Sequence, residues 1–178
     1  ALGAAFGMTV LATDPFVAPE EIARRGARAV SLVELLAQSD VVSLHCLRDP
    51  STLKMIDSGA YARMKRGAIF VSTARGGIHD EQALAQALVS GQISGAGLDV
   101  WDQEPPPLDH PLLQFPTVVA TYHTAGVTTE ARRNMASISA EQIVSLLGGS
   151  RPPRLVNPEV WPVYATRFAR ILGRPVVG

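Results

Sequence analysis

Residues 68–100 read AIFVSTARGGIHDEQALAQALVSGQISGAGLDV, which is the pattern of a strand, a helix and a second strand in succession. The apolar runs at 68–73 and 95–100 are nearly continuous, as in strands buried on both faces. Between them, residues 80–91 have helical apolar spacing, with Asp80 as the expected N-cap and Gly91 as the expected stop. This order predicts two parallel strands joined by a crossover helix.

The same alternation continues on both sides of this unit. Further strands are expected at 9–13, 28–30, 41–45 and 117–123, and further helices at 19–26, 31–39, 58–65 and about 128–147. Strands that alternate with helices predict an α/β fold with a doubly wound parallel sheet. The proline-dense segment 102–111 is expected to be a surface loop, and an amphipathic helix is expected at 164–172.

The composition excludes several classes of protein. The chain has 178 residues, 47% of them hydrophobic, which suffices for one well-buried domain and an appendage. Lys plus Arg and Asp plus Glu each total 16, so no basic excess favours nucleic acid. The single cysteine, Cys46, excludes an internal disulfide and a multi-thiolate metal site, and fits a cytoplasmic location. No apolar run reaches membrane-spanning length. We therefore expect no metal, nucleic acid or membrane partner.

Polar and titratable residues follow the expected strands along one edge of the sheet. They are Asp14, His45, residues 73–77, Asp99 with Glu104 shortly after it, and residues 123–126. In an open parallel sheet, ligands bind beyond the carboxyl ends of the strands. Each residue also has a structural interpretation, because carboxylates cap helices, glycines make turns, arginines face solvent and histidines are accommodated in cores. Their collection on one edge favours a binding site.

The first residues, ALGAAFGMTVLATD at 1–14, raise the question of what precedes them. Residues 1–6 have the pattern of a helix end, Gly7 that of its stop, and residues 8–13 that of a buried strand ending at Asp14. In a dinucleotide-binding βαβ unit, an acidic residue about 20 positions after the glycine loop binds the adenosine ribose. Because only 13 residues precede Asp14, we expect the glycine loop and the first strand upstream of Ala1.

Three stretches resemble a known family: SDVVSLHCL at 39–47, KRGAIFVSTARGGIHDEQALAQALVSGQISGAGLDVWDQEP at 65–105 and TYHTAG at 121–126. They are similar to the D-isomer-specific 2-hydroxyacid dehydrogenases, and the similarity extends from the strand before Asp14 to VNPE at 156–159. That family inserts a Rossmann-like NAD-binding domain into a substrate domain made of both chain ends. The resemblance implies that residues 1–147 are an NAD-binding domain truncated at its N-terminus, and that residues 148–178 return to the substrate domain.

The resemblance also implies a reaction and the residues that perform it. A hydride passes between NAD and the carbonyl carbon of a small 2-keto acid, while a proton reaches the carbonyl oxygen. His123 is the implied proton donor, and the carboxylate of Glu104 fixes its tautomer and favours the imidazolium. Arg75, a planar fork of donors, is the implied clamp for the substrate carboxylate. The residues implied to contact NAD are Asp14, His45, Leu47, Thr52, Thr73, Ala74, Arg75, Asp99, His123, Ala125 and Gly126.

Two other functions stay open at this point. One is an NAD-sensing binding protein, similar to the corepressors related to this family, and the other is an inactive fragment. The Arg75, Glu104 and His123 set favours the enzyme, since a sensor needs no acid/base pair. The resemblance implies a homodimer and a 2-hydroxy acid substrate whose side chain the sequence does not select. The 178-residue chain alone is expected to be inactive, because the glycine loop and most of the substrate domain are expected upstream.

A few residues fall outside the family pattern or have no expected role. Tyr122 occupies the position before His123, where the family usually has proline, and removes no catalytic group. His79 and His110 lie in loop-like contexts, and we assign them no function.

Overall fold

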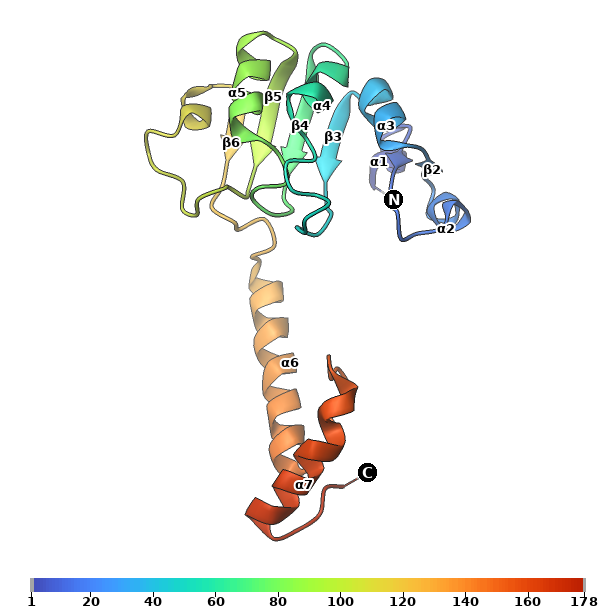
Figure 1. Cartoon of the computed structure of the whole chain (residues 1–178), viewed down its shortest axis with the longest axis vertical. Helices are drawn as coiled ribbons and strands as arrows, with labels where there is room; N and C mark the ends of the chain where they lie inside the picture. The colour runs from blue at the N-terminus through green and yellow to red at the C-terminus, as the bar shows by residue number, and fades with distance from the viewer. Residues whose placement is uncertain (1, 178) are drawn as a thin grey trace. The chain divides into compact units, whose positions relative to one another are not determined.

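The computed structural model describes residues 2–177 and divides into two compact units, Ala1–Ala125 and Gly126–Gly178 (Figure 1). The first unit is α/β, and the second is helical. The elements of the first unit are α1 (Leu2–Ala5), β1 (Leu11–Ala12), α2 (Pro19–Arg24), β2 (Arg28–Ala29), α3 (Leu32–Gln38), β3 (Val41–Leu44), α4 (Ser58–Arg63), β4 (Ala68–Ser72), α5 (Glu81–Val89), β5 (Ile93–Leu98), the 3₁₀ helix η1 (Pro111–Gln114) and β6 (Val118–Ala120). Those of the second are α6 (Thr129–Gly148), the 3₁₀ helix η2 (Pro158–Val160) and α7 (Trp161–Leu172).

The strands are parallel, as the sequence predicts, and form two sheets. One sheet pairs β1 with β2, and the other has the order β3-β4-β5-β6. The doubly wound order 3-2-1-4-5-6 places its first strand between these two groups, and none of residues 2–177 takes that place. The hydrogen-bonding edges of β1 and β3 therefore have no partner strand among the described residues.

This arrangement corrects the expectation for the first strand. Residues 8–13 were expected to form a buried strand, but β1 comprises Leu11–Ala12 and is only half-buried, with Met8 51% exposed. The reason is that β1 is hydrogen-bonded on one side, to β2 alone, within residues 2–177. Its preceding helix α1 does end where expected, since Gly7 has a φ of +73°. Ala1, the first residue of the expected helix, lies outside the described residues.

The core of the first unit lies between the four-stranded sheet and the helices α4 and α5, which cover one of its faces (Figure 1). Its largest fully buried side chains include Tyr61, Phe70, Leu84 and Leu98. Burial alternates along β3 and β4, so the uncovered face keeps apolar residues such as Ile69 (43% exposed) in contact with solvent. Continuous burial of these strands, expected from their apolar runs, is thus not observed in residues 2–177.

Helix capping follows the sequence signals. The side chain of Asp80 accepts a hydrogen bond from the backbone N–H of Ala83 at 3.0 Å and so caps α5, as predicted. Gly91, the predicted stop, has a φ of +67° just after the helix. The Asp80 cap fixes the start of α5 directly after residues 73–79, and Gly91 marks the turn after its end.

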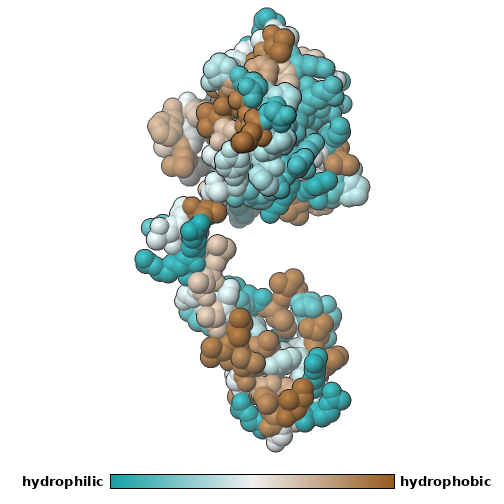
Figure 2. Space-filling view, turned by 90° about the vertical axis from the view of Figure 1, so that its left-hand side faces the viewer, coloured by the Kyte–Doolittle hydropathy of each residue, from teal (hydrophilic) through white to brown (hydrophobic). Residues whose placement is uncertain are grey.

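The second unit is a pair of packed helices. The hydroxyl of Tyr164 in α7 donates to the backbone carbonyl of Leu146 in α6 at 2.6 Å, and Phe168 is buried. A Cβ on Gly149 would lie 2.8 Å from the Phe168 ring, so glycine is required where α6 ends. Figure 2 shows apolar surface on this unit. None of the helices in residues 2–177 is long and apolar enough to cross a membrane.

Candidate active site

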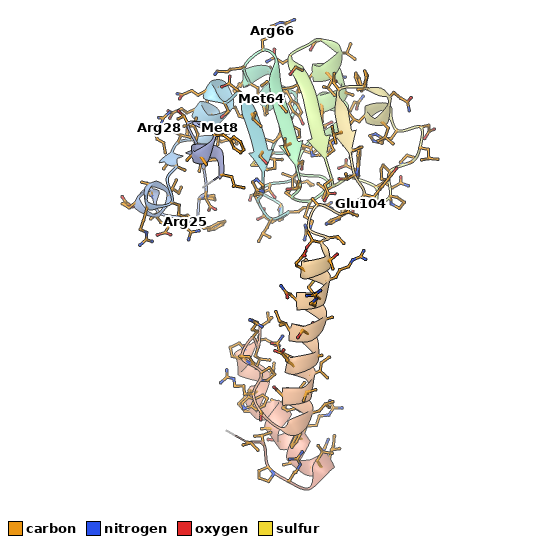
Figure 3. The ribbon with its side chains drawn as sticks, turned by 180° about the vertical axis from the view of Figure 1, so that it is seen from behind. Met8, Arg25, Arg28, Met64, Arg66 and Glu104 are labelled. Atoms are coloured by element: carbon orange, nitrogen blue, oxygen red, sulfur yellow. The ribbon has the colours of Figure 1, made fainter. Side chains whose placement is uncertain are left out.

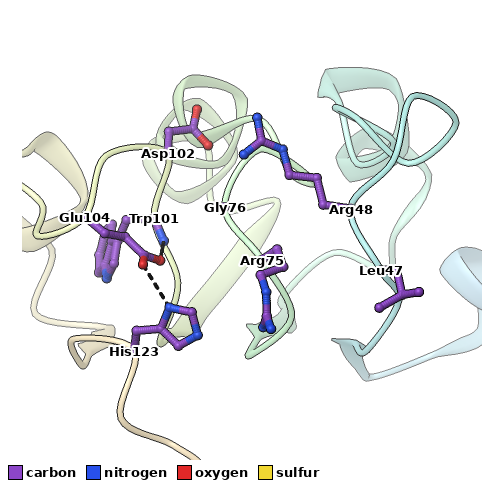
Figure 4. A pocket seen from close by; sticks show the side chains of 8 residues that line it. All are labelled: Leu47, Arg48, Arg75, Gly76, Trp101, Asp102, Glu104 and His123. Atoms are coloured by element: carbon purple, nitrogen blue, oxygen red, sulfur yellow. Dashed lines mark hydrogen bonds and ion pairs between the residues drawn. The ribbon is translucent and has the colours of Figure 1, made fainter. Parts of the chain in front are cut away.

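A pocket lies at the carboxyl edge of the four-stranded sheet. Figure 3 shows Glu104 at this edge, whereas Met64 and Arg66 lie at the opposite end of the strands. The pocket has a volume of about 490 Å³, and all of its lining residues belong to the first unit. They are Leu47, Arg48, Arg75, Gly76, Trp101, Asp102, Glu104 and His123 (Figure 4). Arg75, Glu104 and His123, which the sequence analysis selected for catalysis, are thus brought together with Leu47.

His123 and Glu104 form a hydrogen-bonded pair. Nδ1 of His123 lies 2.8 Å from Oε2 of Glu104, and both side chains are partly open to the pocket (Figure 4). A carboxylate only accepts, so Nδ1 carries a proton and Nε2 is the ring atom left for another partner. The hydrogen bond from His123 lowers the pKa of Glu104, and the backbone N–H of Trp101 and the charges of His123 and Arg75 contribute. Glu104 is therefore an anion at neutral pH.

A second hydrogen bond fixes the Glu104 carboxylate. Its Oε1 accepts from the backbone N–H of Trp101 at 3.1 Å. Trp101 is 3% exposed, and its indole N–H donates to the backbone carbonyl of Thr121 at 2.9 Å. The tryptophan thus connects the loop that carries Glu104 to the segment that carries His123. No motif in the sequence indicates this role for Trp101.

Asp99 holds the loop that presents His123. One carboxylate oxygen of this buried residue accepts from the hydroxyl of Thr121 at 2.6 Å and from the backbone N–H of Thr124 at 2.7 Å. The backbone N–H of Ala125 donates to both oxygens, at 3.1 and 3.0 Å. Burial raises the pKa of Asp99, but these hydrogen bonds outweigh it and hold that pKa below its usual range. A contact of Asp99 with NAD stays a prediction.

The backbone of His123 itself departs from the expectation. The sequence predicts a strand through residues 117–123, but β6 ends at Ala120, and that strand boundary was wrong. His123 has a φ of +55°, in the left-handed region, which an extended strand cannot contain. Its N–H donates to the backbone carbonyl of Asp99 at 2.7 Å, which fixes this turn.

Arg75 follows β4 in a turn that passes very close to the Glu104 loop. Its guanidinium donates to the carbonyl of Ala74 at 2.6 Å, and the side chain is exposed toward the pocket between Leu47 and His123 (Figure 4). A Cβ on the next residue, Gly76, would lie 1.8 Å from the backbone oxygen of Trp101. Glycine at this position is what allows the turn carrying Arg75 to contact the loop carrying Glu104.

We expect Gly76→Ala to destabilise the first unit by about 1–3 kcal/mol, because the methyl group forces one of two backbone segments to move. The measurement is the free energy of unfolding in urea. Gly97→Ala is the matched control, since its Cβ would meet only Val71 side-chain atoms at 3.7 Å. Equal stability changes in the two variants would show that the close contact at Gly76 has no energetic consequence.

The remaining residues with a predicted NAD contact lie outside the pocket lining. Asp14 and His45 are exposed after β1 and β3, and hydrogen-bond the N–H of Phe16 (2.8 Å) and the hydroxyl of Ser43 (2.9 Å), respectively. Thr52 donates to the carbonyl of Leu47 at 2.8 Å and so shapes the turn that presents Leu47. The others are Thr73, exposed after β4; Ala74, buried; Ala125, held by Asp99; and Gly126, the first residue of the second unit. Their roles stay predictions.

The structure adds pocket residues that the sequence analysis did not select. These are Arg48, Trp101 and Asp102, which lie in loops after β3 and β5. Arg48 and Asp102 are charged residues in polar loops, which have no distinguishing sequence signal, and the sequence around Trp101 does not indicate that it lines the pocket. Within residues 2–177, no group of three or more His, Cys, Asp or Glu side chains is arranged to hold a metal ion.

Comparisons with known proteins show the family of this chain. The family described as "D-isomer specific 2-hydroxyacid dehydrogenase, NAD binding domain" matches residues 1–125. D-3-phosphoglycerate dehydrogenase of Archaeoglobus fulgidus is 43% identical over 159 residues, which are 89% of this chain and 30% of that protein. Glyoxylate reductase of Korarchaeum cryptofilum is 44% identical over 155 residues, 87% of this chain and 47% of that protein.

A solved structure gives the same result. D-lactate dehydrogenase with NAD+ from Lactobacillus jensenii superimposes with a TM-score of 0.81 at 32% identity, over 87% of this chain and 50% of that one. The fold and the carboxyl-edge pocket define an α/β nucleotide-binding domain of Rossmann type. The chain belongs to the D-isomer-specific 2-hydroxyacid dehydrogenase family and contains its NAD-binding domain at residues 1–125. It spans half or less of the length of the relatives described above.

Proposed function

We propose that the protein carrying this chain is an NAD-dependent oxidoreductase that interconverts small D-2-hydroxy acids and 2-keto acids. The observation that supports this proposal is the 2.8 Å pair of His123 and Glu104 in the same pocket as Arg75. A dinucleotide sensor or a structural fragment has no need of a positioned acid/base pair beside a guanidinium. A homodimer, which the family resemblance implies, and a cytoplasmic location, which the single cysteine Cys46 fits, are part of the proposal.

The residues present fit NAD at this edge of the sheet. Arg75 and Gly76 after β4 and His123 in the 121–125 loop line the pocket, and the nicotinamide end of NAD would lie there beside His123. Asp14 is exposed after β1, where its carboxylate can accept hydrogen bonds from ribose hydroxyls. When bound, NAD supplies the hydride acceptor or donor for the reaction.

His123 supplies the proton in this proposal. Because Nδ1 is directed to Glu104, Nε2 is the atom that gives a proton to the carbonyl oxygen of a 2-keto acid and removes it in the reverse direction. Ionised Glu104 stabilises the positive charge on the ring and keeps it in one orientation. The Trp101 N–H holds the second carboxylate oxygen, so the pair is oriented before substrate binds.

Arg75 supplies the binding contact for the substrate. Its guanidinium can form two parallel hydrogen bonds with a carboxylate, which a lysine cannot. Its exposed position in the pocket leaves it available to an incoming acid. The described relatives act on phosphoglycerate, glyoxylate and lactate according to their names, so the proposal specifies the 2-hydroxy acid group and no particular side chain.

The test is Glu104→Gln, assayed in the polypeptide as its gene encodes it. Removing the negative charge leaves the His123 ring without the carboxylate that orients it and stabilises its positive charge. We expect kcat for 2-keto acid reduction to fall roughly tenfold or more. Glu20→Gln, an exposed carboxylate in the first turn of α2, is the control. An unchanged kcat for Glu104→Gln would reject the pair as the acid/base unit.

A further inference from the structure

A second histidine–carboxylate pair lies beside the pocket, outside the residues assigned above. Oε2 of Glu81 lies 3.1 Å from Nε2 of His110, and the two side chains are 12% and 16% exposed. Nδ1 of His110 accepts from the backbone N–H of Leu112 at 3.3 Å, at the start of η1. Nε2 therefore carries a proton and donates a hydrogen bond to the Glu81 carboxylate.

The Glu81 carboxylate contacts both ends of the loop formed by residues 102–110. Besides His110 at one end, it binds Asp102 at the other. Its Oε1 accepts from the backbone N–H of Asp102 at 2.8 Å. The two oxygens of one carboxylate thus hold residues 102 and 110, and the proline-dense segment between them contains Glu104. Glu81 is the first residue of α5, whose position is fixed by the Asp80 cap.

The packing of Trp101 links this arrangement to the catalytic pair. The Trp101 and His110 rings meet edge to face, with centroids 5.3 Å apart. Trp101 precedes Asp102, the residue that Glu81 holds, and its own N–H donates to Glu104. A displacement of the loop at Asp102 would therefore move the donor that orients Glu104, and with it the partner of His123.

We propose that Glu81 is a positioning residue: by holding Asp102 and His110 with its two oxygens, it sets the Glu104 carboxylate at hydrogen-bonding distance from His123. This inference rests on the proposed function, because the consequence for rate requires His123 and Glu104 to be the acid/base unit. Sequence analysis assigned no role to Glu81 or His110, since 29 residues separate them and no motif joins them.

The test compares Glu81→Gln with Glu104→Gln and the double variant, in the polypeptide as its gene encodes it. A glutamine oxygen can accept one of the two N–H groups, but its NH₂ cannot accept the other. We expect Glu81→Gln to lower kcat roughly tenfold, as a small misplacement of a catalytic group does. The double variant should be within about twofold of Glu104→Gln alone, because both substitutions act on one group.

Two readouts do not depend on turnover. The downfield proton resonance of the His123 Nδ1–H, hydrogen-bonded to Glu104, should broaden or move in Glu81→Gln. The amide of Asp102 should exchange with deuterium roughly tenfold faster. Asp109→Asn is the matched control, since it neutralises an exposed carboxylate of the same loop that Glu81 holds. It should leave the His123 resonance unchanged.

The outcomes separate the two proposals. If Glu104→Gln leaves kcat unchanged, the proposed acid/base unit fails, and any loss in Glu81→Gln would contradict a route through Glu104. If Glu104→Gln slows the enzyme but the losses of the two variants multiply, Glu81 acts independently and the positioning role is overturned. The same conclusion follows if Asp109→Asn perturbs the His123 resonance as strongly as Glu81→Gln, or if Asp102 exchange is unchanged.

Discussion

Replacing His123 with alanine is expected to lower kcat for 2-keto acid reduction by roughly 10²- to 10⁴-fold, the usual contribution of a positioned proton donor. The imidazole is held through Nδ1 by Glu104 at 2.8 Å, so its removal leaves the pocket without the group oriented to deliver the proton. Arg75 and the rest of the lining are unaffected, and KM should therefore change much less than kcat. Steady-state kinetics on the gene-encoded polypeptide provide the measurement.

Tyr122→Phe is the control for His123→Ala. Tyr122 is the neighbouring residue, is 57% exposed, and has no role in the proposed mechanism. Its substitution should leave kcat within about twofold of the parent. Added imidazole should restore part of the lost rate in His123→Ala but have no effect in the parent. A loss of less than tenfold in kcat would contradict His123 as the proton donor.

The second large effect concerns stability in acid and involves His79. This side chain is fully buried beside Phe70, with ring centroids 5.3 Å apart, and neither ring nitrogen has a hydrogen-bond partner among the described residues. Burial lowers the pKa of His79 to about 4, although the charges of Asp102 and Asp80 oppose the shift. In the unfolded chain the pKa of a histidine is about 6.5. Between pH values of about 4 and about 6.5, the unfolded state therefore binds a proton at His79 that the folded state does not bind.

We therefore expect the first unit to lose up to about 3 kcal/mol of stability through His79 as pH falls from about 6.5 to about 4. The stability is fully present above the unfolded pKa, and the loss is complete below the folded one. Urea unfolding followed by the fluorescence of Trp101, in a Trp161→Phe background, measures it. His79→Val should flatten this part of the pH dependence, whereas the exposed His45→Gln should leave it as it is. An equal acid sensitivity in His79→Val would contradict the prediction.

The elements that could be predicted from sequence are those with local signals. Periodicity and caps identify α5 between Asp80 and Gly91, and the sequence locates α6 almost to the residue, because the relevant hydrogen bonds join residues close in the chain. The α/β class with parallel strands follows from the alternation of strands and helices. The separation into two sheets does not, since it depends on which strands are present to pair with β1 and β3.

The site shows the same division. Arg75, Glu104 and His123 could be selected because they stand after strands in a recognisable family order, and the pocket contains all of them. Most of the contacts that orient these residues join backbone atoms to side chains distant in the sequence, as in Asp99 with Thr124 and Glu81 with Asp102. Such contacts produce no periodic pattern in the sequence, so they could not be predicted from it. His79 lies in the loop between β4 and α5, as expected, but its side chain is buried in the core. The turn-like composition of its neighbours Gly77 and Asp80 gives no indication of this burial.

The left-handed backbone of His123 lowers the stability of the fold at the same residue that we propose as the proton donor. A residue with a Cβ at a φ of +55° is held about 1 kcal/mol or more above its preferred conformation, a cost that glycine avoids and asparagine reduces. Selection for stability alone would therefore replace this histidine. In a duplicated gene released from catalysis, drift at residue 123 toward glycine or asparagine is the expected path, so the identity of this residue distinguishes copies still under selection for proton transfer from copies kept only for their fold.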